Sequence, residues 1–365
     1  MSQIDFLTGG GEELSASPEH KKLDEILHNC PENVTIRESF IKAYSKINDP
    51  KYKTILVSVS GGSDSDVVID ICERVRERDN LKYIWFDTGI EYKATKEHIK
   101  YLEKKYGIEI IRFNPIKTIP KSCREFGQPF ISKYVSEQIM RLQRHGFQWE
   151  DEPYEDLIQR YPKCTSALRW WGSVNTAPGY KSSWFSIDRH RFLKDFIIQN
   201  PPQFNISTKC CTYAKKNVAH QAYKEYGCDL DIIGVRKAEG GVRATNYHNC
   251  FSEGDICDHY RPIFWYKDAD KAEYDKYFHI EHSRCYSEYG FKRTGCVGCP
   301  FNKHIIDELK TIEEYEPGLY KAVSVVFKDS YEYTKKYRDF VKQKKSEEKE
   351  EECSTKAVKA GQQAE

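Results

Sequence analysis

Apolar and polar residues alternate in blocks along the first third of the chain, and these blocks predict strands and helices in turn. Short apolar runs at 54–59, 81–86 and 108–113 are bounded by turn residues, as buried strands are. The segments 65–78 and 92–102 between them place apolar residues at helical spacing. This order of strand and helix predicts a parallel α/β sheet, with the carboxyl ends of the strands at one edge, where such sheets bind ligands.

The rest of the pattern predicts further elements around this sheet. Residues 230–236 have the composition of another strand that ends in a basic loop, and residues 135–200 interrupt the alternation as a helical insertion. No internal repeat is visible. The predicted parts are a helical lead-in at 1–45, an α/β domain at 46–302, a C-terminal helical region at 303–348 and a disordered tail at 349–365.

Composition and charge limit the partners and the cellular compartment that we expect. The formal net charge is +1 and 31% of the residues are charged, so a nucleic-acid or membrane partner would need a local basic patch. No apolar run approaches the roughly 18 residues of a membrane span, and the N-terminus lacks a basic segment followed by an apolar one. We therefore expect a cytoplasmic protein without a membrane partner. In that compartment, 13 cysteines indicate metal, cluster or catalytic use more than a disulfide framework.

The break between the first predicted strand and its helix carries the most specific sequence. Residues 60–65 read Ser-Gly-Gly-Ser-Asp-Ser. Glycines let the backbone approach a ligand, and the first N–H groups of a helix point at an anion. Ser63 and Ser65 add hydroxyl donors, whereas Asp64 is expected to cap the helix or to meet a cation. The Gly-Lys-Ser/Thr of a Walker A loop is missing, and the string resembles the PP-loop of the N-type ATP pyrophosphatase superfamily.

Two cysteine clusters form a second constellation. Cys210 and Cys211 are adjacent, and Cys296 and Cys299 form a C-x-x-C turn. Four thiolates suit either an iron–sulfur cluster or zinc, and a redox pair is the alternative for the turn alone. The reserve ligands are Cys164, Cys250, Cys257 and Cys285, while the isolated cysteines expected to be inert are Cys30, Cys72 and Cys123.

Taken in order, these motifs resemble the phosphoadenosine (or adenosine) phosphosulfate reductase family over roughly residues 45–302. The resemblance implies a PP-loop domain of the adenine nucleotide alpha hydrolase-like type, with ATP or adenylyl sulfate bound and magnesium as a further candidate cofactor. The cysteine pattern is similar to that of the cluster-bearing branch, which implies a [4Fe–4S] cluster on Cys210, Cys211, Cys296 and Cys299, with zinc as the alternative. The implied nucleotide-binding residues are Ser58, Ser60, Gly61, Gly62, Ser63, Asp64, Ser65, Phe86, Asp87, Thr88, Gly89, Gly234, Arg236 and Arg243.

The chain departs from the family pattern at the expected nucleophile. The reductases carry a Glu-Cys-Gly-Leu/Ile-His string near the C-terminus, and the nearest match here is Cys353 in Glu-Cys-Ser-Thr. Its acidic neighbours disfavour a thiolate. Cys353 is therefore the candidate nucleophile on position alone, and Arg236 is the candidate cation for the reacting phosphosulfate.

The second half of the insertion, residues 160–199, interleaves basic and aromatic residues. This composition suits a nucleic-acid backbone and stacked bases, or else an ordinary subdomain that covers the sheet.

Three functions remain open at this stage. The first is reduction of a sulfonucleotide through a cysteine thiolate, with a thiol donor. The second is ATP-dependent sulfur transfer to DNA or tRNA from a persulfide or cluster. The third is a non-catalytic nucleotide-binding module with a structural metal.

Overall fold

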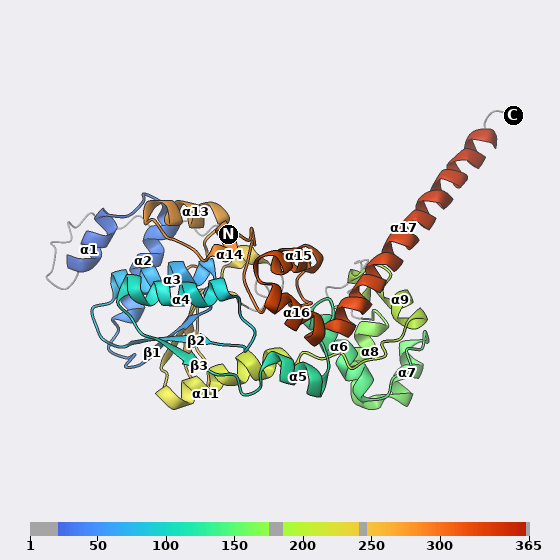
Figure 1. Ribbon diagram of the computed structural model, residues 1–365, viewed down its shortest axis with the longest axis horizontal. Helices are drawn as coiled ribbons and strands as arrows, with labels where there is room; N and C mark the ends of the chain where they lie inside the picture. The colour runs from blue at the N-terminus through green and yellow to red at the C-terminus, as the bar shows by residue number, and fades with distance from the viewer. Residues whose placement is uncertain (1–20, 175–184, 241–246, 363–365) are drawn as a thin grey trace, which may run out of the picture. The chain divides into compact units, whose positions relative to one another are not determined.

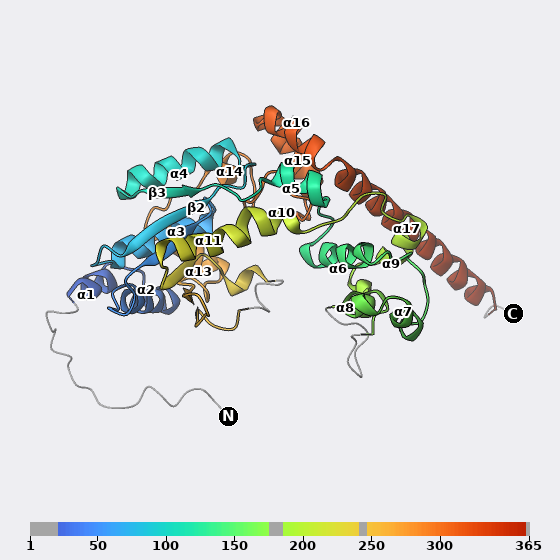
Figure 2. The ribbon, with the colours of Figure 1, turned by 90° about the horizontal axis from the view of Figure 1, so that it is seen from below.

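The computed structural model describes residues 21–174, 185–240 and 247–362, with side chains as far as Glu350. The chain forms two compact units (Figures 1 and 2). Unit 1 comprises the residues through Trp85, Glu97–Arg112 and Ala222–Ser283. Unit 2 comprises Phe86–Lys96, Phe113–Gln221 and the residues from Arg284 onward. The four-part division expected from the sequence remains a prediction.

Unit 1 is built on a six-stranded sheet of order β3-β2-β1-β4-β6-β5. The strands are β1 Ile55–Val59, β2 Leu81–Phe86, β3 Ile110–Phe113, β4 Leu230–Ile233, β5 Phe251–Ser252 and β6 Asp258–Tyr260. Strand β1 pairs in parallel with β2 and β4, and β4 pairs in parallel with β6, whereas β5 runs antiparallel to β6. The predicted parallel α/β fold is confirmed. The short strands β5 and β6 were missed because two or three residues carry no periodicity.

Helices cover both faces of this sheet. They are α1 Lys21–His28, α2 Val34–Ile47, α3 Ser63–Val75, α4 Lys93–Tyr106, α11 Asn217–Tyr226 and α13 Asp268–Tyr277. Figure 1 shows α3 and α4 on one face and α11 on the other. Ile55 and Val57 of β1 are fully buried, as are Val67 and Val68 of α3. A central strand covered on both faces explains why 54–59 is a nearly continuous apolar run.

Unit 2 is helical. Its helices are α5 Ile119–Phe126, α6 Lys133–Arg144, α7 Tyr154–Arg160, α8 Thr165–Trp171, α9 Leu193–Gln199, α10 Lys209–Cys211, α14 Arg284–Ser287, α15 Ile305–Tyr315, α16 Pro317–Val326 and α17 Lys328–Gln362. Figures 1 and 2 both show α6, α7, α8 and α9 gathered together. Helix α17 continues to Gln362, whereas disorder was predicted from residue 349. No helix in the described part of the chain combines the length and the apolar composition that a membrane crossing requires.

The aromatic side chains of the insertion form a core. Trp170, Trp171 and Phe196 are fully buried in one cluster, which the first part of α17 completes with Tyr333. Of the two alternatives for this stretch, the burial of Trp170 and Trp171 favours an ordinary subdomain for these rings, because buried rings are closed to a ligand. Other aromatic residues of the stretch, Tyr180 and Trp184, lie outside the described residues.

Candidate nucleotide loop and cysteine pocket

The loop at residues 60–65 closes on itself through its serines. Ser65 Oγ donates to the Gly62 carbonyl at 2.7 Å, and the Gly62 N–H donates to Ser60 Oγ at 3.3 Å. Gly61 has a φ of 67°, a conformation that costs glycine nothing. Helix α3 begins at Ser63 with Gly62 as its N-cap, two residues before the predicted start. The loop therefore turns the chain sharply from β1 into a helix N-terminus, the feature that binds phosphates elsewhere.

The turn after β4 supports this loop within unit 1. A Cβ on Gly234 would lie 3.1 Å from the Asp64 carbonyl and from the Ser65 nitrogen, so only glycine fits without displacement. Arg236 Nε donates to Asp64 Oδ1 at 2.9 Å, and its Nη1 donates to Asp268 Oδ1 at 2.7 Å. Asp64, expected to cap the helix or meet a cation, meets the guanidinium of Arg236. Burial raises the pKa of Asp64, and the charge of Arg236 opposes that rise.

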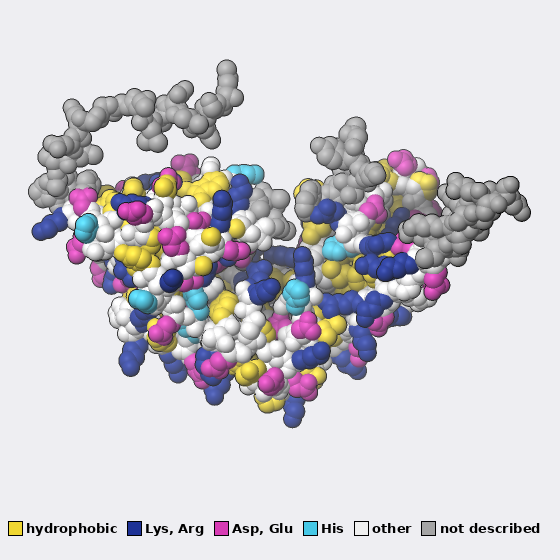
Figure 3. Space-filling model, turned by 90° about the horizontal axis from the view of Figure 1, so that it is seen from above, with side chains coloured by type: hydrophobic (Ala, Val, Ile, Leu, Met, Phe, Trp, Pro, Cys, Tyr) yellow, Lys and Arg dark blue, Asp and Glu magenta, His cyan; other side chains and the backbone are white. Residues whose placement is uncertain are grey.

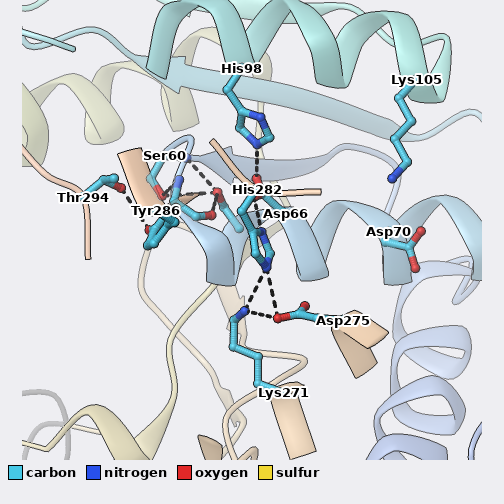
Figure 4. Close-up of polar contacts among 12 residues, drawn as sticks. Ser60, Asp66, Asp70, His98, Lys105, Lys271, Asp275, His282, Tyr286 and Thr294 are labelled. Carbon is cyan, nitrogen blue, oxygen red and sulfur yellow. Dashed lines mark hydrogen bonds and ion pairs between the residues drawn. The ribbon is translucent and has the colours of Figure 1, made fainter. Parts of the chain in front are cut away.

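A buried network of charged side chains lies deeper in the same unit (Figure 4). Asp66 of α3 is 1% exposed, and its carboxylate lies between His98 of α4, at 3.0 Å, and His282, at 2.7 Å. His282 continues to Asp275 of α13 at 3.0 Å, and Lys271 also contacts Asp275. Burial alone would lower the pKa of His282, but hydrogen bonds to Asp275 and Asp66 raise it to about 9. The network ties α3, which begins at the loop, to α4 and α13. Sequence reasoning missed it because the residues are far apart along the chain.

The predicted Asp-Thr-Gly segment follows β2 and belongs to unit 2. The Gly89 N–H donates to Asp87 Oδ1 at 2.8 Å, and Gly89 has a φ of 80°. Thr88 Oγ1 donates to Glu91 Oε1 at 2.6 Å, and Thr88 is fully buried. Burial raises the pKa of Glu91, while the positive charge of Lys215 lowers it. The segment is thus a rigid turn, and Glu91 links it to the cysteines described next.

Three of the four predicted metal ligands line one pocket of unit 2, about 450 Å³ in volume. They are Cys211, Cys296 and Cys299. The fourth, Cys210, is buried beside Cys211, and its thiol also interacts with that of Cys123. The tertiary structure therefore gathers cysteines that are 85 or more positions apart in sequence. Cys123, expected to be an inert buried thiol, adjoins the group.

Lys215 is the cation of this pocket. It interacts with the thiols of Cys296 and Cys211 and with Glu91, and these interactions raise the pKa of its ammonium group. Burial raises the pKa of Cys296, with Lys215 acting in the opposite direction. Burial also raises the pKa of Cys299. Metal binding would have to deprotonate these thiols, so uptake would release protons.

Four thiols are a donor set that either a [4Fe–4S] cluster or zinc takes. Tetrahedral zinc with Zn–S bonds of about 2.3 Å would hold its sulfurs about 3.8 Å apart. Within the described ranges, no three His, Cys, Asp or Glu side chains converge closely enough to hold one metal ion. A [4Fe–4S] cluster spaces its thiolates more widely, because each binds a different iron atom. Cys210, Cys211, Cys296 and Cys299 are the residues that would hold it.

The remaining candidates lie elsewhere. Ser58 is within β1, where its Oγ donates to Asp231 Oδ1 at 3.0 Å. Cys257 belongs to unit 1 and contacts Cys228, and Cys285 contacts Thr95 at 3.7 Å. Neither these two nor the other reserve ligands, Cys164 and Cys250, line the cysteine pocket. Arg243 and the side chain of Cys353 lie outside the described residues.

Two solved structures share similarity with the chain at low TM-scores. A phosphoadenylyl-sulfate reductase from Candida auris, in a phosphate complex, is 13% identical, with a TM-score of 0.39, and covers 78% of this chain and 98% of its own. The U34-tRNA thiolase NcsA from Methanococcus maripaludis, with its [4Fe–4S] cluster, is 14% identical, with a TM-score of 0.36, and covers 82% of this chain and 78% of its own.

Sequence comparison finds a curated relative and a protein family. An uncharacterized protein of Methanocaldococcus jannaschii is 30% identical over 139 residues, which is 38% of this chain. The chain spans 27% of the length of that curated relative. Residues 54–155 match the phosphoadenosine phosphosulfate reductase domain, a segment that includes the loop at 60–65 and the Asp-Thr-Gly turn. Over residues 54–155 the chain is therefore similar to the phosphoadenosine phosphosulfate reductase domain, the family that its motifs resemble.

Proposed function

We propose that this protein is an enzyme of sulfur chemistry that binds an adenine nucleotide on the loop at 60–65 and uses a four-cysteine centre in unit 2. The observation that carries the proposal is the loop itself: a Gly-Gly turn between a buried parallel strand and a helix N-terminus, inside the matched domain. A structural module would not need this arrangement. The cysteine pocket supports the part of the proposal that concerns sulfur chemistry, because three of the four predicted metal ligands line it.

The loop would hold the nucleotide through its phosphates. The partial positive charge at the start of α3 attracts an anion, and Gly61 and Gly62 allow close approach. Arg236 uses Nε and one Nη1 hydrogen in its two ion pairs, so its other N–H groups are available for a phosphate or phosphosulfate. The roles of Ser60, Ser63 and Ser65 as hydroxyl donors are part of this proposal.

The cysteine centre would handle sulfur or electrons. When bound, an iron–sulfur cluster supplies electron transfer and a site for sulfur ligation. The chain's own residues contribute the rest: Lys215 provides a positive charge beside Cys296 and Cys211, and buried Glu91 holds Lys215 in place. That charge favours thiolates over thiols in the pocket.

Two reactions are compatible with this layout. In a reductase, a cysteine thiolate attacks the sulfur of an adenylylated sulfate, the S–O bond to phosphate breaks, and a second thiol releases sulfite as a disulfide forms. In a sulfurtransferase, ATP adenylylates an acceptor with loss of pyrophosphate, and a sulfur nucleophile then displaces AMP.

The products separate these reactions. The full chain is purified without oxygen, and its iron, sulfide and zinc contents are measured. Sulfite release is then assayed with each sulfonucleotide, and pyrophosphate release with ATP in the presence and absence of RNA and DNA. Sulfite identifies the reductase, and nucleic-acid-stimulated pyrophosphate release identifies the transferase. If the protein bound a nucleotide but formed neither sulfite nor pyrophosphate, the proposal of an enzyme would be wrong and a nucleotide-binding module would replace it.

A further inference from the structure

A basic hollow in unit 2 carries charges that the function proposed above does not use, apart from Lys133, whose charge also acts on the Cys211 thiol. Its volume is about 730 Å³, and its walls come from α6, from residues 163–167 at the start of α8 and from the turn at 208–217. The charged side chains that line it are Lys133, Glu137, Arg141, Arg144, Lys163, Lys209 and Lys216, with His145 beside them. Six cations thus face one carboxylate.

The carboxylate of Glu137 already has hydrogen-bond partners within the hollow. Glu137 accepts a hydrogen bond from Arg141 Nε at 3.2 Å and another from Thr208 Oγ1 at 2.8 Å. In the described ranges, Lys133, Arg144 and Lys163 form no ion pair. Basic and acidic side chains are interspersed over the face that Figure 3 shows, in keeping with a net charge of +1. The hollow is therefore a local excess of positive charge, of the kind that a polyanion recognises.

One helical stretch connects the hollow to the cysteine pocket. Residues 209–216 run through α10 into a π-helical turn at Thr212–Lys216. Lys209, Thr212 and Lys216 line the basic hollow, whereas Cys211 and Lys215 line the cysteine pocket. Because side chains three or four positions apart share a helix face, neighbouring faces of one stretch serve the two cavities. The hollow and the cysteine pocket therefore share one short helical stretch as a wall.

We propose that the basic hollow binds the phosphate backbone of a single-stranded nucleic acid. A lone phosphate or nucleotide would engage one or two of these cations, whereas phosphates strung along a strand can engage several at once. Among the described residues, no tryptophan, tyrosine or phenylalanine lines the hollow, so these walls would contact the backbone rather than stack on bases. A nucleotide of the bound strand would then reach the cysteine pocket. Binding of the strand stands by itself, and only this later step rests on the proposed function.

The test measures binding to the full chain. Fluorescence anisotropy follows labelled RNA and DNA strands of identical sequence over a series of KCl concentrations. The variant Lys133→Gln/Arg144→Gln/Lys163→Gln removes three charges from the hollow. The matched variant Lys310→Gln/Lys321→Gln/Lys336→Gln removes three charges from exposed positions of the same unit outside it. Thermal melting checks folding, and single Lys163→Gln, at an exposed position of the short 3-10 helix Pro162–Cys164, serves if the triple variant is unstable.

We expect the hollow variant to raise the dissociation constant at least tenfold at 150 mM salt and to reduce the slope of log K against log salt by about two. The matched variant should stay within twofold of the unaltered chain. The stronger of the RNA and DNA arms identifies the ligand. Absence of binding by the unaltered chain, equal losses in both triple variants, or equally effective competition by inorganic polyphosphate would each overturn the proposal. If the chain bound the nucleic acid but cleaved no ATP, nucleic-acid binding by the hollow would be confirmed and only the sulfurtransferase reaction would be refuted.

Discussion

Arg236 and Asp64 join two turns of unit 1 that lie 172 positions apart in sequence. The guanidinium Nε lies 2.9 Å from Asp64 Oδ1, and the two side chains are only 12% and 17% exposed. Asp64 belongs to the first turn of α3 and Arg236 to the turn after β4. The ion pair therefore holds together the two backbone segments that would contact a nucleotide.

The strength of this pair can be measured with a double-mutant cycle of Asp64→Asn and Arg236→Ala. Each single change should lower the free energy of unfolding by about 1–3 kcal/mol, since Arg236→Ala leaves the Asp64 carboxylate without its partner and Asp64→Asn leaves Arg236 with Asp268 alone. The coupling should be about 1 kcal/mol in urea denaturation. A cycle on the exposed pair Asp307 and Lys310, 4.0 Å apart, is the control and should show no measurable coupling. Equal coupling in the two cycles would remove the special role of Arg236.

Gly234 tests the close approach between the turn after β4 and the loop. In Gly234→Ala the new methyl group meets the backbone of Asp64 and Ser65 at 3.1 Å, so the loop must move. We expect ATP affinity, measured by calorimetry, to fall at least tenfold. In Gly318→Ala the methyl group meets nothing within 4 Å, and affinity should not change. Unaltered ATP binding by Gly234→Ala would place the nucleotide away from this loop.

The histidine network predicts how stability depends on pH. His282 has a folded pKa of about 9, above its ordinary value of 6.5, so its contribution is complete below pH 6.5 and is lost as pH rises to 9. A difference of this size corresponds to at most about 3 kcal/mol. The pKa of Asp66 is lowered, so its contribution is present above about pH 4 and is lost on acidification.

Urea denaturation of the unaltered chain between pH 6.5 and 9 should therefore show falling stability, and His282→Gln should flatten that slope. His28→Gln, at an exposed position of α1, should keep the slope. If the two variants had the same pH profile, another group would be responsible.

The cysteine pocket predicts which thiols retain metal. After anaerobic reconstitution, Cys296→Ser should bind less than half the iron of the unaltered chain, because it removes one of the thiolates lining the pocket. Cys257→Ser removes a buried thiol from unit 1, outside the pocket, and should retain full iron content. Iron and sulfide analysis measures both.

Cys210 and Cys123 are the two candidates for the fourth metal ligand, and their serine variants distinguish them. We expect Cys210→Ser to lose iron and Cys123→Ser to retain it, although their thiols interact. The reverse result would reassign the ligand, and zinc in place of iron would refute the cluster.

Local pattern was enough to predict β1 to β4, the helices α3 and α4 and the glycine loop. Periodicity and turn residues act over a few positions, and a buried parallel strand must be apolar along its length. The adjacent cysteines and the C-x-x-C turn were visible for the same reason. The short strands β5 and β6 and the continuation of α17 past residue 349 were not, because neither carries a distinctive local pattern.

Contacts between distant residues were decided by the tertiary structure alone. Several contacts join segments that no spacing rule connects. They are the ion pair of Arg236 with Asp64, the approach of Lys215 to Cys296 and of Cys123 to Cys210, and the His98–Asp66–His282 network. The same packing buries Trp170 and Trp171 and brings α6 and the turn at 208–217 into one basic hollow. The chemistry available at each motif is thus encoded locally, while its partners depend on which surfaces are buried together as the chain folds.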